Sequence, residues 1–144
     1  MKNRIPTILL IVTILATLFL SACQPPKPAA LSKDQVVVLI QNSLTAIAAG
    51  DYQAFTRDFS DNMKSTFTEP QFASLAELLK KASGSFLTCD GSRPEISNSQ
   101  DYAVYRLMCS YDLEKVIVTV TLKVDGDKIE GLFFDSTNLR KLSQ

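Results

Sequence analysis

Residues 115–124 read KVIVTVTLKV, and the alternation of apolar and polar residues in this stretch indicates the fold class. Val116, Val118 and Val120 share one face of the expected strand, because successive side chains of a strand point to opposite faces. The next two residues, Asp125 and Gly126, are a strong signal for a tight hairpin turn. The sequence therefore predicts an antiparallel strand pair here with the valine face buried.

The same period of two extends over the second half of the chain. It predicts four strands over residues 85–93, 101–111, 115–124 and 128–135, joined by short turns at 112–113 and 125–126. The register is constrained, because a slip of one residue would turn the apolar faces toward solvent. The expected cross-strand pairs are Cys109–Val116, Leu107–Val118, Tyr105–Val120, Ile129–Leu122 and Phe133–Val118.

Residues 32–84 have the helical period instead. A capping-box pattern over 32–35 begins a helix with apolar residues at steps of three and four, which ends at Gly50. Asp51 can cap a short second helix, a loop passes through 61–62, and a third helix runs from Thr68 to Gly84. Helices followed by an antiparallel meander predict an α+β domain in which the N-terminal helices pack on a four-stranded sheet.

The first 23 residues, MKNRIPTILLIVTILATLFLSAC, have the form of a signal sequence, with Lys2 and Arg4 before a short apolar run. The last four resemble the bacterial lipobox, in which the Cys thiol receives a diacylglycerol and the leader is cut just before it. The alternatives are a plain secretory signal and an uncleaved membrane anchor. We expect a lipoprotein signal peptide at 1–22, lipidated Cys23 with a proline-rich tether at 23–30, and a folded domain at 31–144.

This leader predicts a protein held by lipid on the extracytoplasmic face of a membrane, the outer membrane if the cell has one. In such a compartment a disulfide is the default for the two remaining cysteines, Cys89 and Cys109. Pairing them across the first hairpin leaves a polar turn at 98–100. Two free thiols and a redox pair are the alternatives, and the missing Cys-x-x-Cys spacing disfavours redox chemistry.

Composition excludes several classes of function. The chain has no His, so it lacks the commonest general base and the commonest metal ligand. Without its first 22 residues it has 13 basic and 15 acidic residues, a net charge of −2, which disfavours nucleic-acid binding. No phosphate-binding glycine loop, serine nucleophile elbow or zinc-protease helix occurs. We therefore expect no cofactor and no metal.

Residues 48–55, AAGDYQAF, resemble the step between the first two helices of many bacterial members of the nuclear transport factor 2-like superfamily. Residues 62–64, 84–86 and 128–134 resemble one uncharacterised bacterial branch of it, and the likeness covers about residues 31–136. It implies a cone of helices on a curved four-stranded sheet. Enzymatic members place an Asp–His pair or a lone Asp inside the cone, a role that only Asp58 or Asp61 could fill here.

Two sets of residues are the predicted functional sites. Tyr52, Phe55, Phe59 and Tyr105 would line a ligand cavity in the cone or fill its core. An outward apolar face would bind a second copy or an envelope protein, unless the C-terminal segment 138–144 covers it; its residues are Val104, Met108, Ile117, Leu132 and Phe134. The sequence favours a membrane-anchored, non-enzymatic binding module for a partner protein or a small apolar ligand. The alternative is a cryptic isomerase or hydrolase that uses an Asp in the cone.

Overall fold

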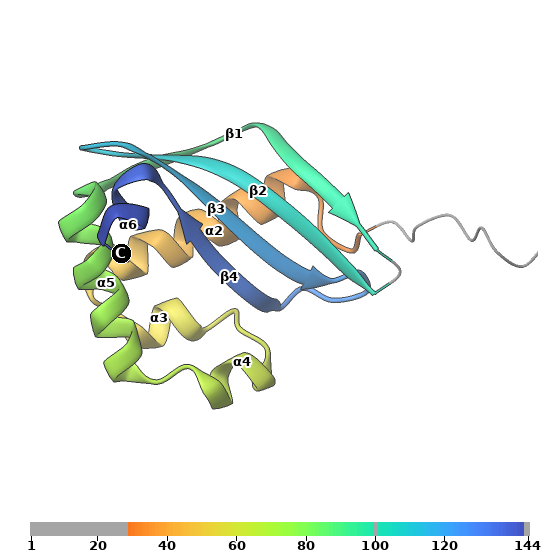
Figure 1. The fold of residues 1–144 in the computed structure, drawn as a ribbon. Helices are drawn as coiled ribbons and strands as arrows, with labels where there is room; N and C mark the ends of the chain where they lie inside the picture. The colour runs from red at the N-terminus through yellow and green to blue at the C-terminus, as the bar shows by residue number, and fades with distance from the viewer. Residues whose placement is uncertain (1–28, 100, 143–144) are drawn as a thin grey trace, which may run out of the picture.

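The computed structural model of the chain describes residues 29–99 and 101–142, and it has the expected α+β architecture (Figure 1). The expected signal peptide and Cys23 lie outside the described residues. The elements in chain order are α2 Lys33–Ala49, α3 Tyr52–Thr56, α4 Asp61–Thr66, α5 Glu69–Ser83, β1 Phe86–Asn98, β2 Tyr102–Tyr111, β3 Lys115–Lys123, β4 Ile129–Asp135 and α6 Thr137–Leu142. No helix in the described part of the chain is long and apolar enough to cross a membrane.

Side-chain caps fix where the helices begin. The Ser32 hydroxyl accepts from the Gln35 amide, while the Gln35 side chain accepts from the Ser32 amide at 2.9 Å, as the capping-box pattern predicts. The prediction of a loop at 61–62 is wrong. The Ser60 hydroxyl accepts from the Met63 amide, and this cap starts the short helix α4.

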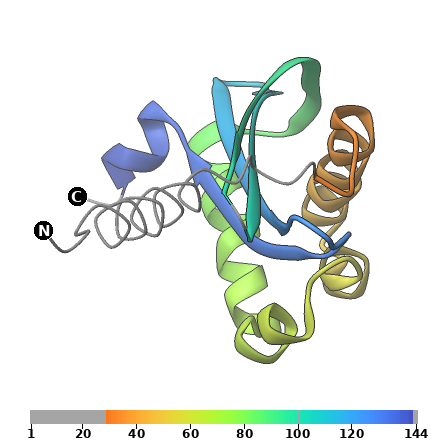
Figure 2. The same ribbon diagram turned by 90° about the vertical axis from the view of Figure 1, so that its right-hand side faces the viewer.

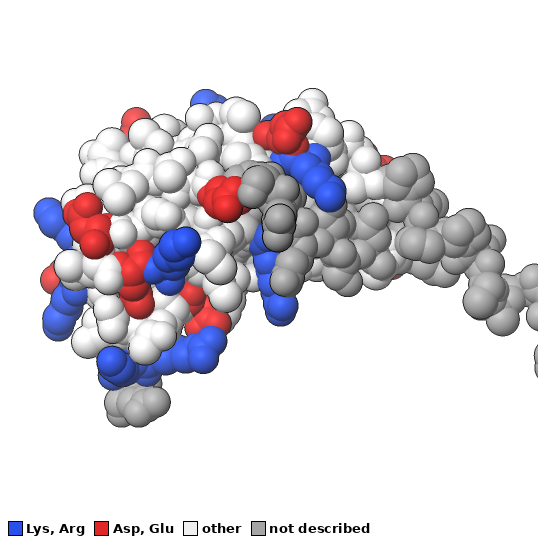
Figure 3. Space-filling model, turned by 90° about the horizontal axis from the view of Figure 1, so that it is seen from above, with Lys and Arg blue, Asp and Glu red and all other residues white. Residues whose placement is uncertain are grey.

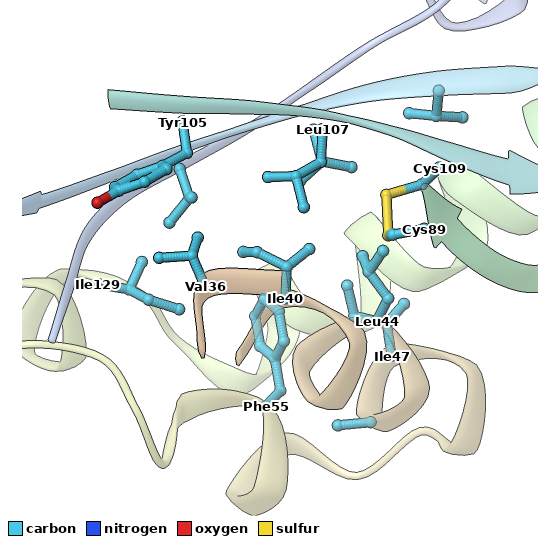
Figure 4. Packing of buried hydrophobic residues seen from close by; sticks show 14 of the residues in the cluster. Val36, Ile40, Leu44, Ile47, Phe55, Cys89, Tyr105, Leu107, Cys109 and Ile129 are labelled. Carbon is cyan, nitrogen blue, oxygen red and sulfur yellow. A yellow bond between two sulfur atoms is a disulfide. The ribbon is translucent and has the colours of Figure 1, made fainter. Parts of the chain in front are cut away.

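The four strands form an antiparallel meander in the order β1-β2-β3-β4. The three pairs expected between β2 and β3 are confirmed, as is the pairing of Ile129 with Leu122. Val116, Val118 and Val120 are completely buried and face the same side of the sheet as the core. Helix α2 covers that side with its own apolar stripe, part of which is visible in Figure 4.

A bulge in β4 overturns one expected pair. Thr121 pairs with Gly131 and Leu122 with Ile129, so Glu130 is an extra residue in β4. An extra residue reverses the faces of all residues that follow it. Val118 therefore lies opposite Phe134 rather than Phe133, and Phe133 points outward.

The first strand is longer and less regular than predicted. Asp90 pairs with Met108 but Glu95 pairs with Arg106, so β1 carries extra residues between these pairs and continues to Asn98. Pro94 lies in this stretch and has no N–H for regular pairing, which an edge strand tolerates. The turn consequently spans 99–101, with the Ser99 amide donating to the Tyr102 carbonyl at 2.8 Å, instead of 98–100.

The disulfide between Cys89 and Cys109 is confirmed, and it joins directly opposite residues of β1 and β2. Both cysteines are buried, and the bond lies above Leu44 of α2 (Figure 4). It therefore ties the irregular edge strand to the centre of the core.

The chain before α2 is held at the far end of β3. The Ala30 amide donates to the Val124 carbonyl at 2.8 Å, and the Leu31 carbonyl accepts from the Tyr105 hydroxyl at 3.0 Å. In the end-on view, α2 and α6 lie on opposite sides of the strands (Figure 2). The short C-terminal helix α6 is thus separated from α2 by the sheet, and it contacts α5.

Candidate functional site

The outer side of the sheet and the adjoining helices carry a group of exposed apolar side chains, which we call the Phe133 surface. Its members are Leu78, Met108, Ile117, Phe133 and Leu142, from α5, β2, β3, β4 and α6. Phe133 is 65% exposed and lies between two shallow depressions of about 500 and 450 Å³, both of which it lines. Groups of exposed apolar side chains are unusual on a monomer, so the Phe133 surface is the candidate site.

The rim of the Phe133 surface is polar and its charges are paired. Arg140 of α6 forms a two-bond ion pair with Asp135 at the end of β4. The hydrogen bonds from Arg140 are the largest influence on Asp135 and, with help from nearby Arg106, they hold its pKa below the ordinary value. In the view from above, Lys and Arg are mixed with Asp and Glu rather than gathered by sign (Figure 3). That face therefore shows no concentration of one sign of charge.

The structure corrects the membership of the predicted interface. Met108 and Ile117 are exposed on the outer face as expected, and Val104 is half-buried there. The bulge at Glu130 turns Leu132 and Phe134 toward the core, where they are partly buried and line only the depression beside α5 and α6. Sequence reasoning missed Phe133, although Gly131 inside a strand pattern is a recognised sign of a bulge.

The C-terminal segment borders the Phe133 surface rather than covering it. In its described part, residues 138–142 belong to α6, which buries Leu139 and leaves Leu142 at the edge of the depression beside α5. Met108 remains 46% exposed beyond it. The apolar face therefore stays open over most of its extent.

The aromatic residues predicted for a ligand cavity lie in the core. Phe55, Phe59 and Tyr105 are each only 1% exposed. The ring of Phe55 lies 4.8 Å from that of Phe59 and 5.2 Å from that of Phe72. The half-buried Tyr52 donates from its hydroxyl to the Phe67 carbonyl at 2.7 Å. These contacts are those of side chains that fill space, the second of the two roles expected for them.

The carboxylate of Glu114, which sequence reasoning did not identify, links the end of α5 to the start of α6. Glu114 accepts hydrogen bonds from the hydroxyls of Ser83 at 2.8 Å and Ser136 at 2.6 Å, and from the Asn138 amide at 3.1 Å. Partial burial raises the pKa of Glu114, but these three hydrogen bonds outweigh it and leave the pKa below its usual 4.5. Since the donors come from α5 and from the start of α6, Glu114 holds three elements together.

The acids considered for catalysis lie outside the core. Asp58 accepts from the Arg57 guanidinium at 2.6 Å, and its backbone carbonyl accepts from the Ile129 amide. Asp61 is exposed in the first turn of α4. Among residues 29–99 and 101–142, no three His, Cys, Asp or Glu side chains are grouped to hold a metal ion.

The fold and the Phe133 surface define a small α+β domain with an exposed apolar surface. Residues 41–132 match the model of the family described as "Protein of unknown function (DUF3887)", which is more than half of the chain. The chain belongs to this family. No curated protein and no solved structure matches it.

Proposed function

We propose that this protein is a lipid-anchored, extracytoplasmic binding module that engages a partner protein through the Phe133 surface and has no catalytic activity. The observation that carries the proposal is the 65% exposure of Phe133 among four other open apolar side chains. With side-chain areas of about 150–200 Å², the five exposed fractions amount to roughly 400 Å² of apolar area. An ordinary protein interface buries about 800 Å² per partner, slightly more than half of it apolar. The surface therefore suits one such interface.

The anchor in this proposal is diacylglycerol on Cys23, supported by the Leu-Ser-Ala-Cys motif at 20–23. Five residues lie between Cys23 and Ala29, where the described chain begins, so an extended tether of six Cα–Cα steps reaches about 20 Å. The tether joins the domain beside Val124, at the end of the sheet where β4 starts. Phe133 lies further along β4, away from that end. Such an anchor would leave the Phe133 surface accessible to a partner.

The wider relationship that we propose is to the nuclear transport factor 2-like superfamily. Helices α2 to α5 before a four-stranded antiparallel sheet, with α2 across the core face, support it. The short step from α2 to α3 through Gly50, with a φ of 69°, and Asp51 also fits.

The anchor is tested with Cys23→Ala in the full chain expressed in bacteria. Without the thiol there is no acceptor for the lipid, so we expect an unprocessed chain without the lipid mass shift. Ser21→Ala is the matched control, because it keeps a small residue before the cleavage site and should be processed normally. A Cys23→Ala chain with the same mass and membrane fractionation as the native protein would refute the anchor.

The surface is tested by a photo-crosslinking amino acid placed at Phe133 or, as a control, at Val38, which is 55% exposed on α2. We expect cross-linked adducts in intact cells from position 133 only, with Ile117→Ser on the same surface reducing their yield at least fivefold. An adduct of twice the chain mass would identify the partner as a second copy. Equal yields from both positions, or none from either, would contradict the proposal.

A further inference from the structure

A second hollow lies at the other side of the domain, between the ends of α2 and α5 and the start of β1. We call it the Tyr111 groove and define it by Ile47, Ala48, Ala76, Leu79, Phe86 and Tyr111. Its volume of about 480 Å³ falls within the 300–1,000 Å³ usual for small-molecule sites. It shares no lining residue with the depression over β2 and β3, and only Leu79 with the depression beside α5 and α6.

The groove exists because small residues face each other where both helices end. Ala48 and Ala49 of α2 and Ala76 of α5 leave space that larger side chains would fill. Helix α2 stops at Gly50 and α5 at Gly84, and both glycines adopt positive φ angles, 69° and 85°. Both glycines line the groove, and after Gly84 the chain continues along its wall through Ser85 and Phe86.

Tyr111 gives the groove a polar group without a partner. It is 7% exposed, and its hydroxyl forms no hydrogen bond with any residue that the structure describes. The hydroxyls of the other tyrosines that pack on the core, Tyr52 and Tyr105, each donate to a backbone carbonyl. Among the described residues no fully buried side-chain oxygen lacks a partner, so the Tyr111 hydroxyl is open to solvent at the wall of the groove, where it is free to donate to a bound molecule.

The Tyr111 side chain is also held in place and kept protonated. Its ring packs edge-to-face on Phe86, with centroids 5.5 Å apart. Burial raises the pKa of the Tyr111 hydroxyl to about 12, so it remains a hydrogen-bond donor at all physiological pH values. A fixed donor beside aliphatic walls selects a mostly apolar molecule that offers one acceptor.

The charge around the groove disfavours an anion. The carbonyl ends of α2 and α5 both point toward this region, and such ends carry a partial negative charge. The last turn of α2 contains no basic residue to offset it. At the end of α5, Lys80 and Lys81 offset the negative helix end and Glu77 opposes them, so the uncompensated negative charge comes from α2. We propose that the Tyr111 groove binds a small, uncharged, largely apolar molecule through a hydrogen bond from the Tyr111 hydroxyl to a carbonyl-type oxygen.

The test uses the full chain in lipid nanodiscs, with ¹³C-labelled alanine methyl groups observed by NMR. The probes are 4-fluoroacetophenone, which has a carbonyl, 1-ethyl-4-fluorobenzene, which has none, and the anion 4-fluorobenzoate. We expect saturable shifts at the methyls of Ala48 and Ala76, with the ketone binding about fivefold tighter than the hydrocarbon. The benzoate should bind more weakly than the ketone.

Two variants distinguish the contribution of the Tyr111 hydroxyl to binding from the contribution of the space in the groove. Tyr111→Phe should abolish the preference for the ketone while keeping the ring contacts, and Ala76→Leu should fill the groove and weaken both neutral probes at least tenfold. Phe133→Ser, on the other surface, should change nothing. Absent shifts at Ala48 and Ala76, a benzoate that binds tightest, or a ketone preference that survives in Tyr111→Phe would overturn the inference. These outcomes do not involve the anchor or the Phe133 surface, so either proposal can fail alone.

Discussion

Removing the disulfide by the double change Cys89→Ala and Cys109→Ala should lower the free energy of unfolding by at least about 3 kcal/mol. The bond closes a loop between residues that are 20 positions apart. In the chain-entropy model, closing a loop of that size lowers the entropy of the unfolded chain and so raises its free energy by about 3 kcal/mol at 25 °C. The bond joins β1, an edge strand, to β2 just before the irregular stretch between Asp90 and Glu95, where regular pairing is interrupted.

The measurement is urea unfolding followed by circular dichroism, on a chain that begins at residue 24 and so contains only these two cysteines. The native chain under a reducing agent is the matched comparison, because it keeps both buried sulfur atoms and loses only the cross-link. We expect the reduced chain to lose about 3 kcal/mol, and the alanine variant to lose somewhat more because it leaves a cavity. A loss below about 1 kcal/mol in the reduced chain, or two reactive thiols in the unreduced protein, would refute this reasoning.

Two further predictions concern the end of the domain where α5, the β2–β3 turn and α6 meet. Gly84→Ala should destabilise the domain by at least about 1 kcal/mol more than Gly50→Ala in the same urea assay. Both glycines have positive φ, but a Cβ at Gly84 would lie 3.0 Å from the Asp112 Cβ, whereas Gly50 faces open space. Equal losses of unfolding free energy in the two variants would contradict the close approach at Gly84. Glu114→Gln should weaken the domain by about 1–3 kcal/mol at neutral pH and speed hydrogen exchange in α6. Because folding lowers the pKa of Glu114 below 4.5, its contribution is present above pH 4.5 and is lost as pH falls through the folded pKa. Below pH 4.5, the unfolding free energy of Glu114→Gln should therefore fall less steeply with falling pH than that of the native protein. An equally steep fall in both proteins would contradict the role of Glu114.

Sequence reasoning worked where local chemistry decides the outcome. The capping pattern at Ser32 and the alternation around Val118 each depend on residues within one element, and both appear in the structure as expected. It was wrong at Phe133, because a bulge depends on how two strands fit together and shifts everything after it. It was also wrong at the end of β1, where extra residues move the turn to 99–101.

The sequence by itself determined the α+β class and the order of helices before strands, because periodicity and turn chemistry are local. It also predicted the pairing of Cys89 with Cys109, which the strand register confirms. Only the tertiary structure decided which apolar residues stay exposed. Phe133 and Phe134 are neighbours of the same type, and one extra residue in β4 sends the first to the surface and the second to the core. The unpaired Tyr111 hydroxyl likewise has no signature in the sequence, since a missing partner depends on all the groups that pack around it.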